Sequence, residues 1–307
     1  MVRLATGMGD IVVRGARDSR WKPGAERSEA ILERLIAATA AGDVPLRLLI
    51  VVAHPDDEAI GAGALLAHYP DATIAHLTDG GGLGEGAAQS RGYRSREEYA
   101  DTRRREVVAC LSLIGIPPSR VRSLGIPDGA AGQRLVASCR AIMDLMDDVD
   151  PDVVLTHPYE GGHSDHDAAA FGVHLAAGLL RRDGEHAPII LELTSYHHAN
   201  GRRVRGRFLP YDGVSVHSVV LGADERRRKA SMFAAFESQR AVLEQFSLHV
   251  ERFRVAPRYL FTAPPHAGVL DYERFRLGIS GGQWRAQAAR ALDVLRARAR
   301  PGRRRDG

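Results

Sequence analysis

The stretch LRLLIVVAHPDDE, residues 46–58, joins a continuous run of Leu, Ile and Val to a segment with one imidazole and three carboxylates. An apolar run without alternating polar residues is typical of a strand that is buried on both faces of a parallel sheet. The polar segment 54–58 follows at the point where that strand would end. The stretch therefore predicts a central strand of an α/β fold with a chemically active turn directly after it.

Outward from this stretch, strand-like and helix-like segments alternate along the chain. The expected strands are 46–53, 72–78, 121–126, 152–157 and 188–196, and the expected helices are 59–68, 97–113, 133–146 and 167–181. This alternation is typical of βαβ units and predicts an α/β, Rossmann-like three-layer fold with a mostly parallel sheet. Beyond it, we expect a C-terminal α+β elaboration with strands at 214–221 and 258–263 and one long helix at 224–246.

The length of 307 residues allows one large core with appendages. We expect 1–45 to be an N-terminal extension with one helix, 46–282 a single α/β domain with its core at about 46–200, and 283–307 an Arg-rich C-terminal helix and tail. The last segment holds eight Arg and two Asp, whereas the whole chain has a net charge of only +4. The basic charge is therefore terminal, which argues against a nucleic-acid partner for the body of the chain.

Several other classes of protein are disfavoured by the composition. No apolar run reaches the roughly 18–20 residues of a membrane span, and the first 22 residues lack the apolar stretch of a signal peptide. We therefore expect a cytoplasmic protein without a stable membrane anchor. The two cysteines, Cys110 and Cys139, match neither a disulfide framework nor a CxxC zinc pattern, so buried thiols are expected. The sequence leaves the oligomeric state open, a homo-oligomer included.

A second polar segment, His163-Ser164-Asp165-His166, follows the expected strand 152–157. In open parallel sheets the ligand crevice lies beyond the carboxyl ends of the strands, so this segment and 54–58 should meet there. Taken alone, the first segment could equally be a helix N-terminus whose carboxylates favour the helix dipole. Two imidazoles and a carboxylate in the second segment favour a metal site instead.

Catalytic zinc takes three His or carboxylate ligands and keeps one position for water. His54 and Asp57, three residues apart on a turn, and His166 are the expected ligands. Asp56 is then placed to take a proton from water. His163 is expected to donate to an oxyanion or a leaving amine, and Asp165 to orient the ring of His163.

The segments AHPDDE (53–58) and GHSDH (162–166) resemble the two signature motifs of the LmbE-like, or PIG-L, family of zinc-dependent N-acetylglucosaminyl deacetylases. The resemblance covers roughly 46–200. It implies the ligand set and the roles given above, with Asp56 as the general base and His163 polarising the carbonyl.

The resemblance also implies two substrate-binding residues. Arg103 stands where the family carries an Arg that contacts the sugar, and Asp128 where it carries an acid that binds sugar hydroxyls. One departure concerns Gly161, because some members carry a Tyr there that is proposed to assist the oxyanion. Tyr159 and Tyr196 are the candidates to replace it. A Gly-rich loop at 80–96 is a candidate lid, and His157 either lines the pocket or bonds the loop beside it.

These inferences together predict a Zn²⁺-dependent hydrolase that removes acetyl from an N-acetyl amino sugar or its conjugate. An amidase that acts on a larger sugar conjugate with a different acyl group is the nearest alternative, and an inactive sugar-binding α/β domain is a second. Fe²⁺ would accept the same ligands as Zn²⁺. The expected partner is a small N-acetylated sugar or glycoconjugate.

Overall fold

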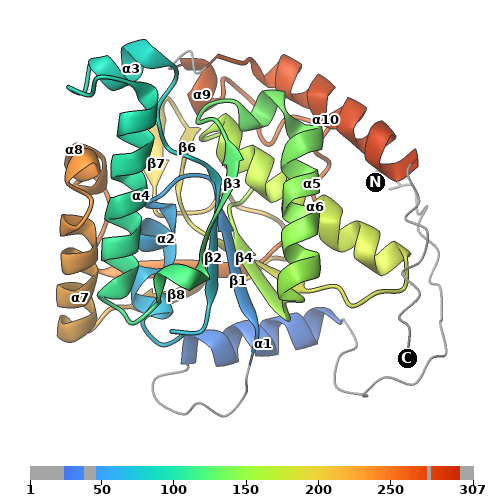
Figure 1. Ribbon diagram of the computed structural model, residues 1–307. Helices are drawn as coiled ribbons and strands as arrows, with labels where there is room; N and C mark the ends of the chain where they lie inside the picture. Colours follow the sequence, from blue (N-terminus) through green and yellow to red (C-terminus); the bar gives the residue numbers. More distant parts are fainter. Residues whose placement is uncertain (1–23, 38–45, 275–277, 298–307) are drawn as a thin grey trace.

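The computed structural model describes residues 24–37, 46–274 and 278–297 (Figure 1). Seven strands form one sheet in the order β3-β2-β1-β4-β5-β9-β8. Their bounds are β1 Leu48–Val52, β2 Thr73–Thr78, β3 Val121–Ile126, β4 Val153–Thr156, β5 Ile189–Leu193, β8 His217–Val220 and β9 Val250–Val255. The five strands β1 to β5 pair in parallel, while β9 and β8 are antiparallel additions at one edge. The predicted fold class is confirmed.

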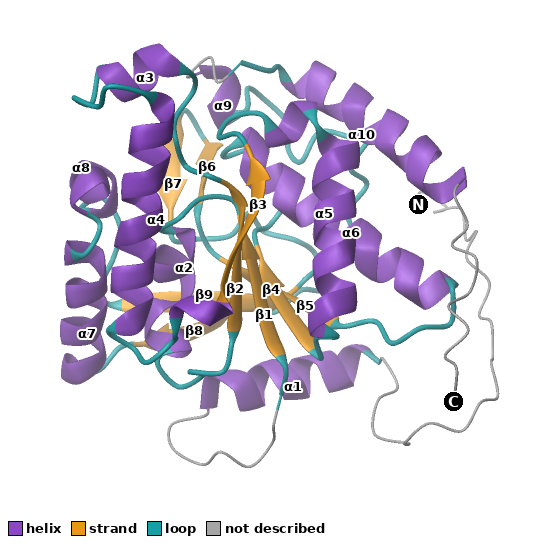
Figure 2. Ribbon diagram, in the orientation of Figure 1, coloured by secondary structure: helices purple, strands orange, loops and turns teal. Residues whose placement is uncertain are grey.

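Helices cover both faces of this sheet (Figure 2). One layer contains α1 Ala25–Ala37, α2 Asp57–Leu66, α4 Arg96–Ser112 and α7 Ala223–Ala234, and the other contains α5 Leu135–Val149, α6 Ser164–Arg182 and α10 Gly281–Ala297. Alternate residues of β1 enter the two cores, Leu49 and Val51 on one side and Ile50 and Val52 on the other. The apolar run is continuous because both faces of β1 are covered.

Short elements complete the described structure. They are α3 Glu85–Gln89, α8 Arg240–Leu243, α9 Asp271–Arg274, the hairpin of β6 Tyr196–Ala199 and β7 Arg202–Arg205, and the 3-10 turns Pro118–Arg120, Ala131–Gln133 and Glu237–Gln239. None of the helices in the described part of the chain is long and apolar enough to cross a membrane. Cys110 and Cys139 are free and buried, as expected.

The C-terminal half differs from expectation in three places. The expected helix 224–246 is wrong beyond Ala234, because Phe236 leaves the helical region (φ −97°, ψ 68°) and a 3-10 turn follows. The expected strand 258–263 forms turns instead, and the antiparallel strand is β9. The strand pattern of β9 was hidden by its charged residues Glu251 and Arg254, which are buried because they are paired.

The N-terminal boundaries differ less. The expected strand 188–196 ends at Leu193, and Tyr196 begins the separate hairpin. Within the candidate lid 80–96, the structure forms the short helix α3. The one helix expected within 1–45 corresponds to α1 among the described residues. The domain boundaries stay a prediction.

The helix α10 packs into the core beside α5 and α6. Trp284 is fully buried, and its indole Nε1 donates to the Ser164 carbonyl over 3.1 Å. Ala288, Ala291 and Leu295 continue the same buried stripe. The first turn of α6, which carries the second polar motif, is therefore held from the C-terminal end of the chain.

We expect Trp284→Ala to lower the free energy of unfolding by about 3–5 kcal/mol, because the change leaves a cavity and removes an indole hydrogen bond. Urea denaturation followed by circular dichroism measures this loss. Leu260→Ala, at a side chain that is 70% exposed, is the control and should change the value by less than about 0.5 kcal/mol. Equal values for the two variants would contradict the packing of α10.

Candidate metal centre and active site

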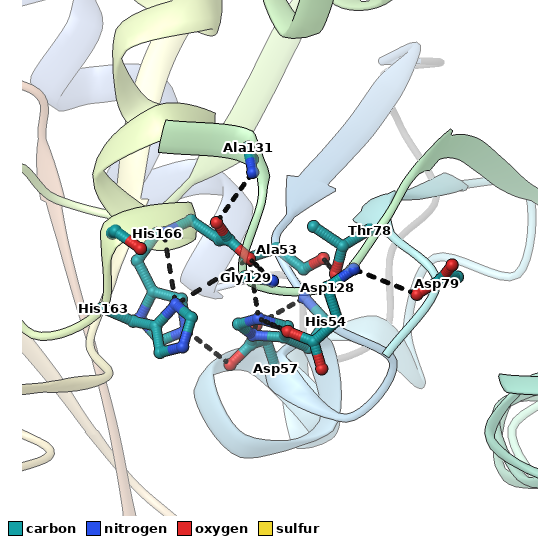
Figure 3. Close-up of polar contacts among 12 residues, drawn as sticks. Ala53, His54, Asp57, Thr78, Asp79, Asp128, Gly129, Ala131, His163 and His166 are labelled. Carbon is teal, nitrogen blue, oxygen red and sulfur yellow. Dashed lines mark hydrogen bonds and ion pairs between the residues drawn. The ribbon is translucent and has the colours of Figure 1, made fainter. Parts of the chain in front are cut away.

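The two polar motifs meet beyond the carboxyl ends of neighbouring parallel strands (Figure 3). His54 to Glu58 lead from β1 into α2, and His163 to His166 lead from β4 into α6. The loop after β3 adds Asp128 beside them. The strands β1, β3 and β4 lie among four neighbouring strands in the order β3-β2-β1-β4. Residues about a hundred positions apart therefore meet at the carboxyl edge of the sheet.

The three expected metal ligands come together. His54 Nδ1 lies 3.2 Å from Asp57 Oδ2, and His166 Nε2 lies 3.4 Å from Asp57 Oδ1. One ligand atom of each residue lies within 4.8 Å of the others, as a single ion would require. Two nitrogen donors and one carboxylate oxygen are a donor set that zinc accepts.

A second group shares His54. Its Nε2 faces Asp128 Oδ1 at 3.2 Å, and His54, Asp128 and His163 also satisfy the same distance limit. The two sides of the His54 ring are visible in Figure 3, with Asp57 on one and Asp128 on the other. Asp57 and His166 are buried, whereas Asp128 is partly exposed. The group with the buried Asp57 and His166 suits a bound metal ion, and the group with the partly exposed Asp128 suits contact with a substrate.

The charge states of Asp57 and His166 also suit metal binding, whereas at His54 burial, which lowers the pKa, is outweighed by the surrounding carboxylates, chiefly Asp128, which raise it well above its ordinary value. Burial acts to raise the pKa of Asp57, but His166 and His157 outweigh it and hold that pKa well below its usual range. Burial lowers the pKa of His166 well below its ordinary value. An ionised carboxylate and a neutral imidazole are the forms that bind a metal.

Two residues hold His166 that the sequence did not identify as its partners. Ser195 Oγ lies 3.3 Å from His166 Nδ1, on the side of the ring away from Asp57. The His157 ring stacks on His166 with centroids 4.0 Å apart, and its Nε2 accepts a hydrogen bond from the Ala53 N–H. Ser195 has no sequence signal beyond its position two residues after β5, because only the fold brings it to α6.

Asp56 lies directly beside this group in a constrained backbone. Its φ of 147° is rare for a residue other than glycine, so the turn is strained where it presents the carboxylate. Burial raises the pKa of Asp56 to about 7, and the Arg103 guanidinium opposes that rise. A carboxylate with a pKa near neutral suits a general base.

The structure gives Arg103 a contact other than the expected one with sugar. Its side chain is 4% exposed, and its Nη2 lies 3.0 Å from Asp56 Oδ2. The same nitrogen donates to the Pro55 carbonyl. Within the described residues Arg103 therefore supports the first motif, and its contact with a substrate stays a prediction.

The expected orientation of His163 by the Asp165 carboxylate needs correction. His163 Nδ1 accepts a hydrogen bond from the backbone N–H of Asp165 over 3.2 Å, while the carboxylate is 4.0 Å away. That carboxylate instead accepts from the N–H groups of Gly129 and Ala131, at 2.7 and 3.0 Å. The reason is that Asp165 is fully buried, and the loop after β3 offers it two unpaired donors.

The start of the candidate lid is tied to Asp128. Asp128 Oδ2 accepts from the Gly82 N–H over 2.9 Å, and Asp79 accepts from the Asp128 N–H over 3.1 Å. Arg96 pairs with Asp79 and closes the loop at its other end. The loop therefore begins and ends on residues that are linked to the site.

The position of Gly161 is closed to larger side chains. Its φ is 69°, and a Cβ there would lie 2.7 Å from the Leu270 side chain. Of the two candidate tyrosines, Tyr159 is buried and donates to the Ala263 carbonyl over 2.9 Å. The Tyr196 ring instead lies edge-on to His166, with centroids 5.3 Å apart. Tyr196 is therefore the tyrosine that the structure brings to the metal centre.

Comparison with known proteins identifies the family of this part of the chain. The family PIG-L, described as GlcNAc-PI de-N-acetylase, matches residues 49–177. These residues are a PIG-L (LmbE-like) family domain. The matched range contains both polar motifs, Arg103 and Asp128.

Two curated relatives carry the same description, 1D-myo-inositol 2-acetamido-2-deoxy-alpha-D-glucopyranoside deacetylase. The protein from Salinispora arenicola is 38% identical in an alignment of 146 residues that covers 39% of this chain and 46% of the relative. The protein from Kineococcus radiotolerans is 32% identical in an alignment of 184 residues that covers 48% of each chain. The chain thus spans about half the length of the curated relatives it matches.

Solved structures support the fold. An antimicrobial pseudoaglycone deacetylase has a TM-score of 0.52 at 22% identity, over 70% of this chain and 99% of that one. A deacetylase from the biosynthesis pathway of teicoplanin has a TM-score of 0.52 at 18% identity, over 68% and 96%. At these identities the likeness concerns the fold alone.

We expect Ser195→Ala to weaken Zn²⁺ binding about 10-fold, because His166 loses the partner on its Nδ1. Competition with a chromophoric chelator measures the dissociation constant. Ser218→Ala, at an exposed position on β8, is the matched control and should bind Zn²⁺ as the wild type does. Identical affinities in both variants would argue against His166 as a ligand held by Ser195.

Proposed function

We propose that this protein is a metal-dependent hydrolase that removes the acetyl group from an N-acetylglucosamine-type amino sugar or its conjugate. One observation carries the proposal, namely the convergence of His54, Asp57 and His166 from two distant motifs on one point. The family of residues 49–177 and the names of the relatives are consistent with this activity.

In this proposal His54, Asp57 and His166 hold the ion, for which zinc is the first candidate and Fe²⁺ a second. When bound, zinc supplies a Lewis acid that polarises the amide carbonyl and acidifies water. The other steps belong to the protein. They are proton removal, stabilisation of developing charge and placement of the sugar.

Asp56 takes a proton from the attacking water, whose oxygen then bonds to the acetyl carbon. Because His163 Nδ1 accepts from the Asp165 N–H, the neutral ring carries its proton on Nε2 and can donate to the oxyanion. The C–N bond breaks when the protonated Asp56 carboxyl passes this proton to the amine nitrogen, and acetate and a free amino sugar result. Asp128, the most open acid in the group, is proposed to bind sugar hydroxyls.

A direct assay tests the proposal. The Zn²⁺-loaded protein is incubated with N-acetylglucosamine and with its inositol glycoside, and both acetate and free amine are measured. We expect equal amounts of the two products. No product from these two sugars, but free amine and a longer carboxylic acid from sugar conjugates with a larger N-acyl group, would indicate an amidase with another acyl specificity. No free amine from any N-acyl sugar would favour a binding protein.

Asp56→Asn and Asp57→Asn separate the base from the ligand. We expect Asp56→Asn to keep stoichiometric Zn²⁺ and lose about 10²- to 10⁴-fold in kcat, since the amide cannot take the proton. Asp57→Asn should lose most of its Zn²⁺, because a charged ligand is gone. Acetate release and metal analysis measure the two effects. If both variants keep metal and turnover, the assignment of roles is wrong.

Tyr196→Phe tests whether the Tyr196 hydroxyl helps to hold the oxyanion in the place of a side chain at Gly161. We expect kcat to fall about 100-fold with the Zn²⁺ content unchanged. Tyr159→Phe is the matched control, because it removes a buried hydrogen bond away from the metal centre. It should cost about 1 kcal/mol in unfolding and leave kcat unaffected. The opposite pattern would assign the role to Tyr159.

A further inference from the structure

Arg254, on strand β9, is a fully buried arginine that bridges two carboxylates. Its Nε lies 2.6 Å from Glu192 Oε2, and its Nη2 lies 3.3 Å from Glu160 Oε1. Its Nη1 donates to the Leu209 carbonyl over 2.9 Å, and its guanidinium lies 4.2 Å from the centre of the Phe208 ring. A guanidinium carries five N–H donors in a planar fork, so it can serve several acceptors at once.

Glu160 connects this cluster to the second motif. Glu160 lies three residues before His163, in the loop between β4 and α6. Besides Arg254, its carboxylate accepts from the Leu209 N–H over 2.7 Å and lies 2.9 Å from His197 Nδ1 on β6. The carboxylate is 3% exposed. The Glu160 side chain thus joins the loop to β9, to the β6–β7 hairpin and to the backbone of Leu209.

The loop also has anchors that do not involve Arg254, among them the Gly161 carbonyl, which accepts from the Asp271 N–H over 2.8 Å. On its inner side, the N–H groups of Glu160 and Gly161 donate to Asp167 Oδ1, over 3.3 and 3.0 Å. Gly161 and Gly162 follow, and glycine has the greatest backbone freedom of any residue. The direction of the next side chain, His163, therefore depends on how firmly the residues before the glycines are held.

We propose that Arg254 is a positioning residue, which through Glu160 fixes the loop that directs the His163 ring toward the metal centre. The inference rests on the proposed function, which assigns His163 its role. Arg254 lies outside residues 49–177. The positioning role therefore gives the C-terminal half a part in the activity of the matched domain.

The test compares Glu160→Gln with Glu192→Gln. Each variant removes one carboxylate partner of Arg254, but only Glu160 belongs to the loop. We expect Glu160→Gln to lower kcat about 10- to 100-fold with KM within about threefold, as a small displacement of a catalytic group does. Both variants should lower the thermal midpoint of unfolding by similar amounts. Glu192→Gln, however, should keep kcat within about threefold of the wild type.

Arg254→Lys provides a second variant if Glu160→Gln does not fold. The ammonium of lysine keeps the charge but is a single point without the planar fork, so it cannot hold both carboxylates and the Leu209 carbonyl in the same geometry. We expect kcat to fall by about 10-fold, again with KM within about threefold. Wild-type kcat in Arg254→Lys and Glu160→Gln would overturn the proposal.

The ring resonances of His163 in a long-range ¹H–¹⁵N spectrum, assigned with His163→Gln, provide a readout that does not depend on turnover. We expect Glu160→Gln to shift them and Glu192→Gln to leave them in place. If kcat falls equally in the two variants, in step with their thermal midpoints, and these resonances do not move, Arg254 has only a structural role. A wild type that releases no acetate, together with shifted resonances in Glu160→Gln, would refute the proposed function and retain the positioning role.

Discussion

The Asp57 carboxylate is the contact on which the rest of the site depends. It is 4% exposed, and its two oxygens face His54 Nδ1, His157 Nε2 and His166 Nε2 at 3.2–3.4 Å. A buried carboxylate is costly unless it is paired, so the His54 and His166 rings must stay beside it. His54 follows β1 and His166 lies on α6, so this one charge joins the two motifs.

The C-terminal half supplies further buried charges to the same segments. Helix α2 breaks at Ala62 (φ −145°), and Glu251 accepts from the free N–H groups of Ala64 and Leu65. Lys229 pairs with Glu251 and donates to the Ile60 carbonyl. Each contact satisfies a backbone group that the break in α2 leaves unpaired. The Lys229–Glu251 pair thus supports α2, the helix at the first motif, as Arg254 supports the loop before the second motif. In both places the C-terminal half stabilises the parallel part of the fold.

Much of the core was accessible from the sequence because its signals are local. Strands β1, β4 and β5 are mostly apolar runs, and the alternation of β1 to β5 with helices predicts a parallel sheet. Strand β9 was missed because Glu251 and Arg254 read as surface residues, and their burial depends on partners from α7 and β5. The break at Phe236 was missed because the helical pattern continues through it.

The sequence by itself determined the fold class and the two segments that supply the candidate ligands, because an apolar run followed by imidazoles and carboxylates places them at one edge of a parallel sheet. Only the tertiary structure decided which groups support them. Ser195 on His166, Arg103 on Asp56 and the backbone of Asp165 on His163 are contacts over 3.0–3.3 Å. The first two of these pairs are far apart in the chain, and the third is a choice between the backbone and the carboxylate of one residue. Such contacts depend on buried groups finding partners in three dimensions.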